Sequence, residues 1–398
     1  MARTAFPASS SVRTLCCDRA GGRVALRRKS GDIEIPAGPP ALRCKLDKAA
    51  LKGDQGVSGP LKCLVTGCAG FIGSHTAEKL LEEGCRVVGV DDFDHYYPRR
   101  VKLANLSDLL NSPGFKFVEG DLCKLPLRNL LRDVEAIVHL AGQPGVRASW
   151  GNTFSRYARN NVLATQMLLE QACMSPLRVF VYASSSSVYG AAKRFPTSED
   201  HPKVPISPYG ITKLCAEQLC FAYQERLRAP IVRLRYFSVY GPRQRPDMVM
   251  HKMIKDVLSD GTLDVFGDGS QTRDFTYVQD IVEANWLAVS HPSEDADMNI
   301  AGGDPVSINH AIELVEDIAG KELHVRHLPQ EIGDPLNTHA STVRAKRLIG
   351  FKAKTRLRDG LLRQFEWQQH SGVSSAREKR RHFSPIEDGM GAKHQRSN

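Results

Sequence analysis

The sequence predicts an α/β fold in which a doubly wound parallel sheet carries a second, smaller α/β part. Two observations predict it. Short apolar runs alternate with helical stretches from Lys62 to Tyr236, which is the pattern of successive βα units. A turn rich in glycine lies between the first apolar run and the first helical stretch, and parallel sheets bind ligands at such strand ends.

The first unit reads as strand, turn, helix and strand. Its opening run, Cys63 to Val65, is short and apolar, as buried parallel strands are, and a helix is expected over 74–83. Between them Gly67, Gly70 and Gly73 recur at intervals of three residues. This order is the context that the dinucleotide fingerprint requires, because glycines let the backbone approach a pyrophosphate at the helix N-terminus.

Asp91 ends the second apolar run, about twenty residues after the glycine turn. A carboxylate at this place accepts hydrogen bonds from an adenosine ribose and would repel a 2′-phosphate. The sequence therefore predicts NAD rather than NADP as the cofactor. The alternative is a glycine-rich turn that binds no ligand.

Tyr209 and Lys213 are four residues apart, so on a helix they share one face, and Pro208 suits the start of that helix. A phenol has an ordinary pKa of about 10, so a tyrosine base near pH 7 needs roughly 4 kcal/mol of preference for the phenolate. A nearby ammonium and the positive nicotinamide of NAD supply such a preference. We interpret the pair as a tyrosine base with its lysine.

A serine run follows the buried strand expected over 179–183. Hydroxyls of Ser184 to Ser187 at the C-terminal end of a parallel strand point into the ligand crevice, where they can donate to an oxygen that becomes a ketone. The alternative for both motifs is an exposed serine loop and a helix-surface Tyr/Lys pair.

In this order the motifs resemble those of the extended short-chain dehydrogenases/reductases of the nucleotide-sugar epimerase/dehydratase group, over about residues 61–367. The resemblance also includes Gly120-Asp121-Leu122, the His139–Gly142 run, Asn161, Arg235-Tyr236-Phe237 and the Gly267–Phe275 segment. It implies a Rossmann-type NAD-binding domain, a smaller α/β domain for a nucleotide sugar, and a homodimer. It implies cofactor contacts from Gly67, Gly70, Phe71, Ile72, Gly73, Asp91, Asp121, Leu122, Leu140, Ala141, Asn161, Tyr209 and Lys213.

The same resemblance assigns the other roles. Ser185 acts with Tyr209 and Lys213 in catalysis, while Arg273 binds the nucleotide diphosphate and Asp334 belongs to the substrate site. One position departs from the pattern: an Arg or Gln usually stands two residues before the Gly333-Asp334 pair, and here it is Glu331. A carboxylate there would repel a diphosphate, so either Gln330 takes the role or nucleotide affinity is weakened.

The serine positions distinguish the kinds of sugar chemistry. Sugar dehydratases carry Asp and Glu where this chain has Ser186 and Ser187, UDP-xylose-forming decarboxylases carry Glu at Ser187, and UDP-glucose 4-epimerases carry Asn at Ser238. The Ala183–Gly190 and Tyr240–Met248 segments instead resemble those of UDP-glucuronate 4-epimerases.

There is a chemical reason for this pattern. Oxidation of a glucuronate at C4 gives a β-keto acid that loses CO2 easily, so the carboxylate must be held away from that geometry. Ser186, Ser187, Ser238 and Arg245 can hold it through charge-assisted hydrogen bonds. The alternatives are a UDP-glucose/UDP-galactose 4-epimerase, with Arg245 a solvated loop residue, and a plastid RNA-binding protein on the same fold.

Composition separates a near-neutral body from two basic tails. Residues 1–60 hold 11 Lys/Arg against 5 Asp/Glu and residues 371–398 hold 6 against 3, so the tails carry +9 of the net charge of +10. We therefore expect no nucleic-acid partner. Mean hydropathy is −0.31 and no apolar run approaches a membrane span, so no membrane partner is expected either. The ten cysteines show no metal-binding spacing, which indicates free thiols and no metal site.

The predicted layout has four parts. Residues 1–60 are an extension and linker whose first thirty residues are rich in Ser, Ala and Arg with a single acid, Asp18; this is typical of a transit peptide. Chloroplast is the first interpretation, and mitochondrion, cytoplasm or a plain disordered extension are the alternatives. The NAD-binding domain is expected over 61–236 with a return segment at 275–290, the substrate domain mainly over 237–370, and a disordered basic tail over 371–398.

Overall fold

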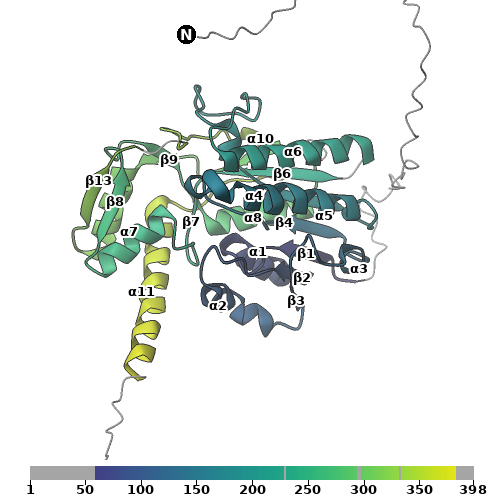
Figure 1. The fold of residues 1–398 in the computed structure, drawn as a ribbon, viewed down its shortest axis with the longest axis horizontal. Helices are drawn as coiled ribbons and strands as arrows, with labels where there is room; N and C mark the ends of the chain where they lie inside the picture. Colours follow the sequence, from purple (N-terminus) through teal and green to yellow (C-terminus); the bar gives the residue numbers. More distant parts are fainter. Residues whose placement is uncertain (1–58, 228–229, 294–296, 331–332, 382–398) are drawn as a thin grey trace, which may run out of the picture. The chain divides into compact units, whose positions relative to one another are not determined.

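The computed structural model describes residues 59–227, 230–293, 297–330 and 333–381 (Figure 1). Its centre is a seven-stranded sheet in which every neighbouring pair is parallel, in the order β11-β6-β5-β4-β1-β2-β3. The order reverses between β1 and β4, so the predicted doubly wound Rossmann-type sheet is confirmed. The strands are β1 (Lys62–Thr66), β2 (Arg86–Asp91), β3 (Phe115–Glu119), β4 (Ala136–His139), β5 (Val179–Ser185), β6 (Ile231–Tyr236) and β11 (Asp297–Ile300).

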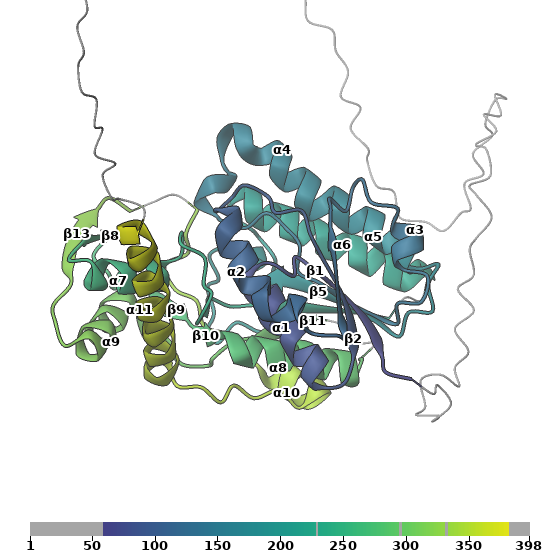
Figure 2. The same ribbon diagram turned by 90° about the horizontal axis from the view of Figure 1, so that it is seen from below.

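Helices cover both faces of this sheet (Figure 2). Alternate residues of one strand face opposite layers: Val65 packs in the cluster that contains α1, whereas Leu64 packs in the one that contains α5. One layer contains α1 (Phe71–Glu82), α2 (Arg99–Leu110), α8 (Val278–Ser290) and α10 (Val343–Ile349). The other contains α3 (Leu127–Leu130), α4 (Phe154–Tyr157), the π-helix η4 (Ala158–Leu163), α5 (Ala164–Ala172) and α6 (Pro208–Leu227).

A smaller α/β part is built from segments that follow β6. Two short parallel strands, β8 and β13, pair with each other, and α7, α9 and α11 pack together nearby (Figure 2). Its apolar side chains join the core beneath the sheet without interruption. The elements are β7 (Val239–Tyr240), α7 (Val249–Leu258), β8 (Thr262–Phe266), β9 (Thr272–Asp274), β10 (Thr276–Tyr277), β12 (Pro305–Ser307), α9 (Ile308–Ala319), β13 (His324–Leu328) and α11 (Leu357–Arg381).

The structure moves two of the predicted boundaries. The return to the sheet does not stop at residue 290, because β11 pairs with β6 as the edge strand and α10 contacts both β11 and α8. Helix α11 continues to Arg381 and so overlaps the first residues of the tail expected from Ser371, where no proline interrupts the helix. The predicted transit peptide and the tail from residue 382 lie outside the described residues.

None of the described helices is long and apolar enough to cross a membrane. Nor do the described residues contain a group of three or more His, Cys, Asp or Glu side chains that could hold a metal ion.

Candidate active site

The glycine turn connects β1 to α1 and forms one wall of a pocket at the carboxyl ends of the strands. A Cβ added at Gly73 would lie 2.0 Å from the Gly67 carbonyl oxygen, so no side chain fits there. The helix therefore starts directly against the turn, and its first backbone N–H groups can face a pyrophosphate. This cradle, with an acid at the end of β2, fits the dinucleotide NAD.

Asp91 lies at the end of β2 and is 6 % exposed. Its oxygens accept hydrogen bonds from the backbone N–H of Ala69, at 3.2 Å, and of Phe93, at 2.8 Å. It also pairs with the ammonium of Lys102 at 3.3 Å. The acid expected to contact the ribose is thus in the pocket, but with a lysine partner that the sequence did not reveal.

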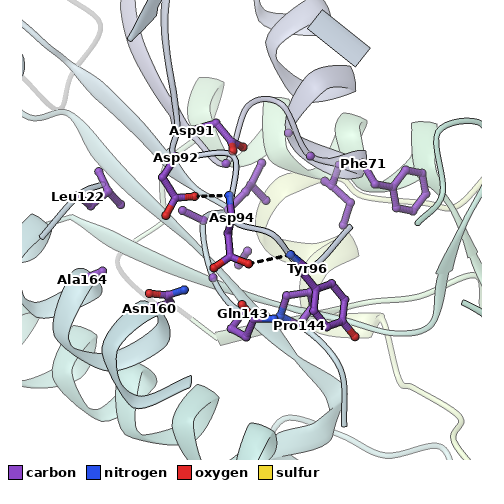
Figure 3. Close-up of a pocket in the computed structure, with 18 of the residues that line it drawn as sticks. Phe71, Asp91, Asp92, Asp94, Tyr96, Leu122, Gln143, Pro144, Asn160 and Ala164 are labelled. Carbon is purple, nitrogen blue, oxygen red and sulfur yellow. Dashed lines mark hydrogen bonds between the residues drawn. The ribbon is translucent and has the colours of Figure 1, made fainter. Parts of the chain in front are cut away.

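A loop after β2 forms a second wall of the pocket. Figure 3 shows Asp92 and Asp94 on this loop, with Leu122, Asn160 and Ala164 lying across from them. Each acid accepts a hydrogen bond from a backbone N–H two residues on, Asp92 from Asp94 at 2.9 Å and Asp94 from Tyr96 at 3.0 Å. These local bonds hold the loop in a defined course over the pocket.

The ends of β1 and β4 are joined by a buried histidine. His139 contacts the hydroxyls of Thr66, at 2.7 Å, and Thr165, at 3.0 Å. Burial, reinforced by the nearby Lys213 ammonium, lowers the pKa of His139 to about 3, so the ring stays neutral. Thr66 in turn accepts hydrogen bonds from the N–H groups of Leu140 and Ala141, which fixes the strand end where both residues line the pocket.

Tyr209 and Lys213 lie one turn apart near the start of α6, which begins at Pro208 as expected, and both line the pocket. Burial raises the pKa of Tyr209, and the Ser185 hydroxyl and the Arg245 guanidinium oppose that rise. Lys213 donates to the Ala183 carbonyl at 2.9 Å. Arg245 is therefore a cation that favours the phenolate, a role that the spacing along the chain did not suggest for it.

The serine run ends β5 and packs against the start of α6. A Cβ added at Gly210 would lie 2.6 Å from the Ser187 carbonyl oxygen, so the glycine lets Tyr209 approach the serines. Ser185 caps the short 3₁₀ helix η5 (Ser186–Tyr189) by accepting from the Ser187 N–H at 3.1 Å. Ser184 lines the pocket and donates to the buried Glu217 carboxylate at 2.5 Å.

Arg245 enters the same pocket from the loop after β7. Only 18 % of its side chain is exposed, and its Nε and Nη2 each lie 3.0 Å from a carboxylate oxygen of Asp247. The Tyr96 hydroxyl also donates to Asp247, at 3.2 Å. Burial alone would raise the pKa of Asp247, but the guanidinium lowers it, so the pair is ionised. The bonds to Asp247 occupy one edge of the guanidinium.

Arg273 and Asp334 lie together away from the pocket lining. Arg273 donates to the carbonyls of Thr272, at 2.9 Å, and Leu336, at 3.0 Å. Asp334 pairs with Arg147 at 2.9 Å, and the guanidinium of Arg147 stacks on Phe266 at 3.9 Å. Burial, together with the nearby Arg147, lowers the pKa of Arg273, as expected where two cations share one acid. Two guanidinium groups with one carboxylate suit an anion such as a diphosphate.

Most of the predicted cofactor residues line a single pocket. Asn161 does not, because its amide bridges the Gln143 backbone and the Thr212 hydroxyl and so joins the strand-end loop to α6. Ser186 and Ser187 form η5 beside the pocket, and Ser238 lies between β6 and β7. Glu331 lies outside the described residues. The residues that line it as predicted are Gly67, Gly70, Phe71, Ile72, Gly73, Asp91, Asp121, Leu122, Leu140, Ala141, Tyr209 and Lys213.

Several functional candidates were not expected from the sequence. Lys102 meets Asp91 from α2, and Tyr96 meets Asp247 across a long stretch of chain. Arg147 reaches Asp334 from a 3₁₀ turn, η2 (Arg147–Ser149). The one available signal was the spacing of Lys102 and Asn105, which places both on one face of α2.

Lys213 gives a test that depends on pH. Burial lowers its pKa to about 8, against the opposing effect of Glu217. Below pH 8 the fold carries a buried charge, and between about pH 8 and 10.5 the unfolded chain holds a proton that the fold has lost, so stability rises with pH. We expect Lys213→Met to stabilise the cofactor-free chain by roughly 3 kcal/mol below pH 8, with a gain that shrinks above it.

Denaturant unfolding from pH 6 to 10 measures this gain. Lys321→Met, which removes an exposed lysine paired with Asp260 at 2.7 Å, is the control and should show no such trend. A gain for Lys213→Met that does not change with pH would contradict the buried charge.

Comparisons with known proteins agree with this site. Residues 63–301 match the model of the NAD dependent epimerase/dehydratase family. The chain is 45 % identical over 303 residues to an uncharacterized UDP-glucose epimerase, YtcB, of Bacillus subtilis, covering 76 % of this chain and 96 % of that one. It is 36 % identical over 313 residues to a UDP-glucuronate 4-epimerase of Thermodesulfobacterium geofontis, covering 77 % and 96 %. It also resembles the UDP-glucuronic acid 4-epimerase of Bacillus cereus solved with UDP-glucuronic acid and NAD, with 41 % identity, a TM-score of 0.76 and coverage of 78 % and 100 %.

Proposed function

Because the chain belongs to the NAD dependent epimerase/dehydratase family, we propose that it is a UDP-glucuronate 4-epimerase, which interconverts UDP-glucuronate and UDP-galacturonate. The observation that carries the proposal is the position of Arg245, whose guanidinium enters the pocket near the Tyr209 phenol. A neutral hexose offers no anion for this group, whereas a glucuronate brings a carboxylate on the carbon next to C4.

The chain's own residues perform the proton transfers. Tyr209 takes the proton of the 4-hydroxyl and returns it after the 4-keto sugar has turned its other face to the cofactor. The hydroxyls that end β5 stabilise the developing carbonyl oxygen, and Arg245 supplies positive charge to the phenolate. When bound, NAD accepts the hydride from C4 and then returns it. The site residues that would hold NAD are the glycine turn, Asp91, Asp121 and Lys213.

Arg245 and the serines also suppress the side reaction. At the keto stage the sugar is a β-keto acid, and loss of CO2 requires its carboxylate to lie perpendicular to the carbonyl plane. The second edge of Arg245, together with small hydroxyl side chains at Ser186, Ser187 and Ser238, can hold the carboxylate away from that orientation.

Analysis of the reaction products shows which UDP-sugar the chain accepts as substrate. Purified chain should convert UDP-glucuronate to UDP-galacturonate, seen by chromatography and mass spectrometry, with little UDP-pentose. The Bacillus subtilis relative bears the name of a UDP-glucose epimerase, so UDP-glucose is the second substrate to supply. Turnover of UDP-glucose with none of UDP-glucuronate would replace the proposal with a hexose epimerase.

The assembly is proposed to be a homodimer. Apolar side chains of η4 and α6 leave a shallow depression lined by Val162, Pro205, Ile211, Leu214, Cys215, Gln218 and Leu219, and Ile211 is 46 % exposed. A second copy would cover this face by pairing its own two helices with these. Analytical ultracentrifugation that finds only monomer at micromolar concentration would contradict this.

We also infer plastid import and no nucleic-acid partner. The Ser- and Arg-rich N-terminus supports import, and a near-neutral body with an intact tyrosine site argues against RNA binding. Residues 1–60 fused to a fluorescent protein should enter chloroplasts in leaf cells; accumulation in mitochondria or cytosol would overturn the proposal. Retention of RNA by the purified chain at physiological salt would overturn the inference that the chain has no nucleic-acid partner.

A further inference from the structure

Asp91, the acid expected to contact the adenosine ribose, has a buried cationic partner. Its carboxylate and the Lys102 ammonium lie 3.3 Å apart, with 5 % and 8 % of their side chains exposed. Both residues line the pocket, Asp91 from the end of β2 and Lys102 from α2. At this position the pocket presents an ion pair and not a lone carboxylate.

Neighbouring contacts hold the lysine at this place. One helical turn further along the buried face of α2, Asn105 donates to the Ala69 carbonyl in the glycine turn at 3.0 Å. The Lys102 ammonium also lies 5.2 Å from the centre of the Tyr97 ring, which lines the same pocket. Helix α2 is thereby fixed to the turn, and the ammonium stays close to the ribose side of the pocket.

The ion pair changes the physical basis expected for the preference for NAD over NADP. A lone carboxylate would repel a 2′-phosphate, but a carboxylate neutralised at 3.3 Å repels it much less. A lysine ammonium is itself a phosphate ligand. The preference for NAD over NADP then depends on which group holds the ammonium, the protein's carboxylate or the ligand's phosphate.

We propose that Lys102 is a specificity-determining residue of the cofactor site, a phosphate-binding cation that Asp91 occupies and so withholds from NADP. Asp91 then has two effects. It accepts hydrogen bonds from the ribose hydroxyls of NAD, and it keeps the nearby Lys102 ammonium in an ion pair. Removing the carboxylate leaves a free ammonium in the pocket at the place where a 2′-phosphate would sit.

The surrounding charges leave this role to Lys102. Arg99 pairs with Glu119 at 2.6 Å and Arg156 pairs with Asp94 at 3.2 Å, and neither arginine lines the pocket. Asp92 does line it and keeps a negative charge nearby, so the gain in NADP affinity after loss of Asp91 should be limited.

A binding cycle tests the assignment without sugar or turnover. Isothermal titration of NAD and NADP would be compared for the parent, Asp91→Ala, Lys102→Met and the double variant. We expect Asp91→Ala to weaken NAD and tighten NADP by about tenfold or more, and Lys102→Met in that background to abolish the NADP gain. Lys102→Met alone should weaken NADP further, because the Asp91 charge is then uncompensated.

Arg100→Met is the matched control, since it removes an exposed positive charge from the same helix away from the pocket and should leave the NADP gain intact. If a variant melts early, Asp91→Asn and Lys102→Gln preserve side-chain size and repeat the cycle. A double variant that keeps the NADP gain would overturn the proposal, as would an Asp91 variant without any gain. Both readouts are binding constants, so a failed epimerase assay leaves the test valid.

Discussion

Tyr209→Phe is expected to reduce epimerase turnover by about 10²- to 10⁴-fold while leaving NAD binding nearly unchanged. The Tyr209 phenol, beside the Ser185 hydroxyl in the pocket, is the group proposed to take the 4-hydroxyl proton, and its hydroxyl is all that the substitution removes. Burial raises the pKa of Tyr209, and Arg245 opposes the rise. The bound nicotinamide adds a second positive charge beside the phenol, so the base is expected to form only in the loaded enzyme.

Steady-state turnover of UDP-glucuronate, with NAD affinity measured separately, checks this expectation. Tyr223→Phe is a matched control, because it removes a tyrosine hydroxyl from the same helix, α6, at a position that does not line the pocket. Turnover close to that of the parent in Tyr209→Phe would remove the tyrosine from the mechanism.

Arg245→Ala is expected to lower kcat/KM for UDP-glucuronate by at least about tenfold more than for UDP-glucose. A charge-assisted hydrogen bond contributes roughly 1.5–3 kcal/mol, and only the glucuronate has the carboxylate to form it. The substitution also leaves Asp247 without its partner, which adds repulsion toward the same substrate. A UDP-pentose by-product should increase, since the β-keto acid is no longer held away from the geometry of CO2 loss.

Two variants separate charge from geometry. Arg245→Lys keeps the positive charge but loses the fork that matches a carboxylate, so it should recover only part of the activity. Asp247→Asn keeps the guanidinium and removes the acid that holds it. Equal losses on both sugars in Arg245→Ala would show that the arginine serves the tyrosine alone, and the glucuronate interpretation would fail.

The sequence predicted the parts of the fold that depend on local patterns. The glycine turn, the strand ends and the start of α6 at Pro208 are each encoded within a few neighbouring residues, and all of them were found. The edge strand β11 was missed, because a strand of only four residues carries little periodic signal.

In the site, too, the features encoded by local patterns were predicted and those set by distant contacts were not. Residues within motifs, such as Asp91 and Tyr209, were named from the sequence and line the pocket. Their partners were not named: Lys102 lies on the helix that follows the strand of Asp91, and Asp247 approaches the Tyr96 loop across some 150 residues of chain. Pairings of this kind are set by tertiary packing, and spacing along the chain does not identify the two partners. The bridge that the Asn161 amide makes between Gln143 and Thr212 was not foreseen for the same reason.

The late strand β11 constrains how the chain can be assembled. Before residues 297–300 leave the ribosome, β6 is an unpaired edge, and the fully buried Arg235 lacks Asp297, which contacts its Nη2 at 2.6 Å. Tyr189 likewise lacks its partner Asn299, whose side-chain oxygen accepts a hydrogen bond from the tyrosine hydroxyl at 2.7 Å. The nucleotide-binding half therefore cannot finish folding during synthesis until the first part of the substrate half has been made. A shortened chain that ends near residue 290 would expose a strand edge and leave Arg235 with the Glu217 carboxylate as its remaining acidic partner, and would be prone to aggregate.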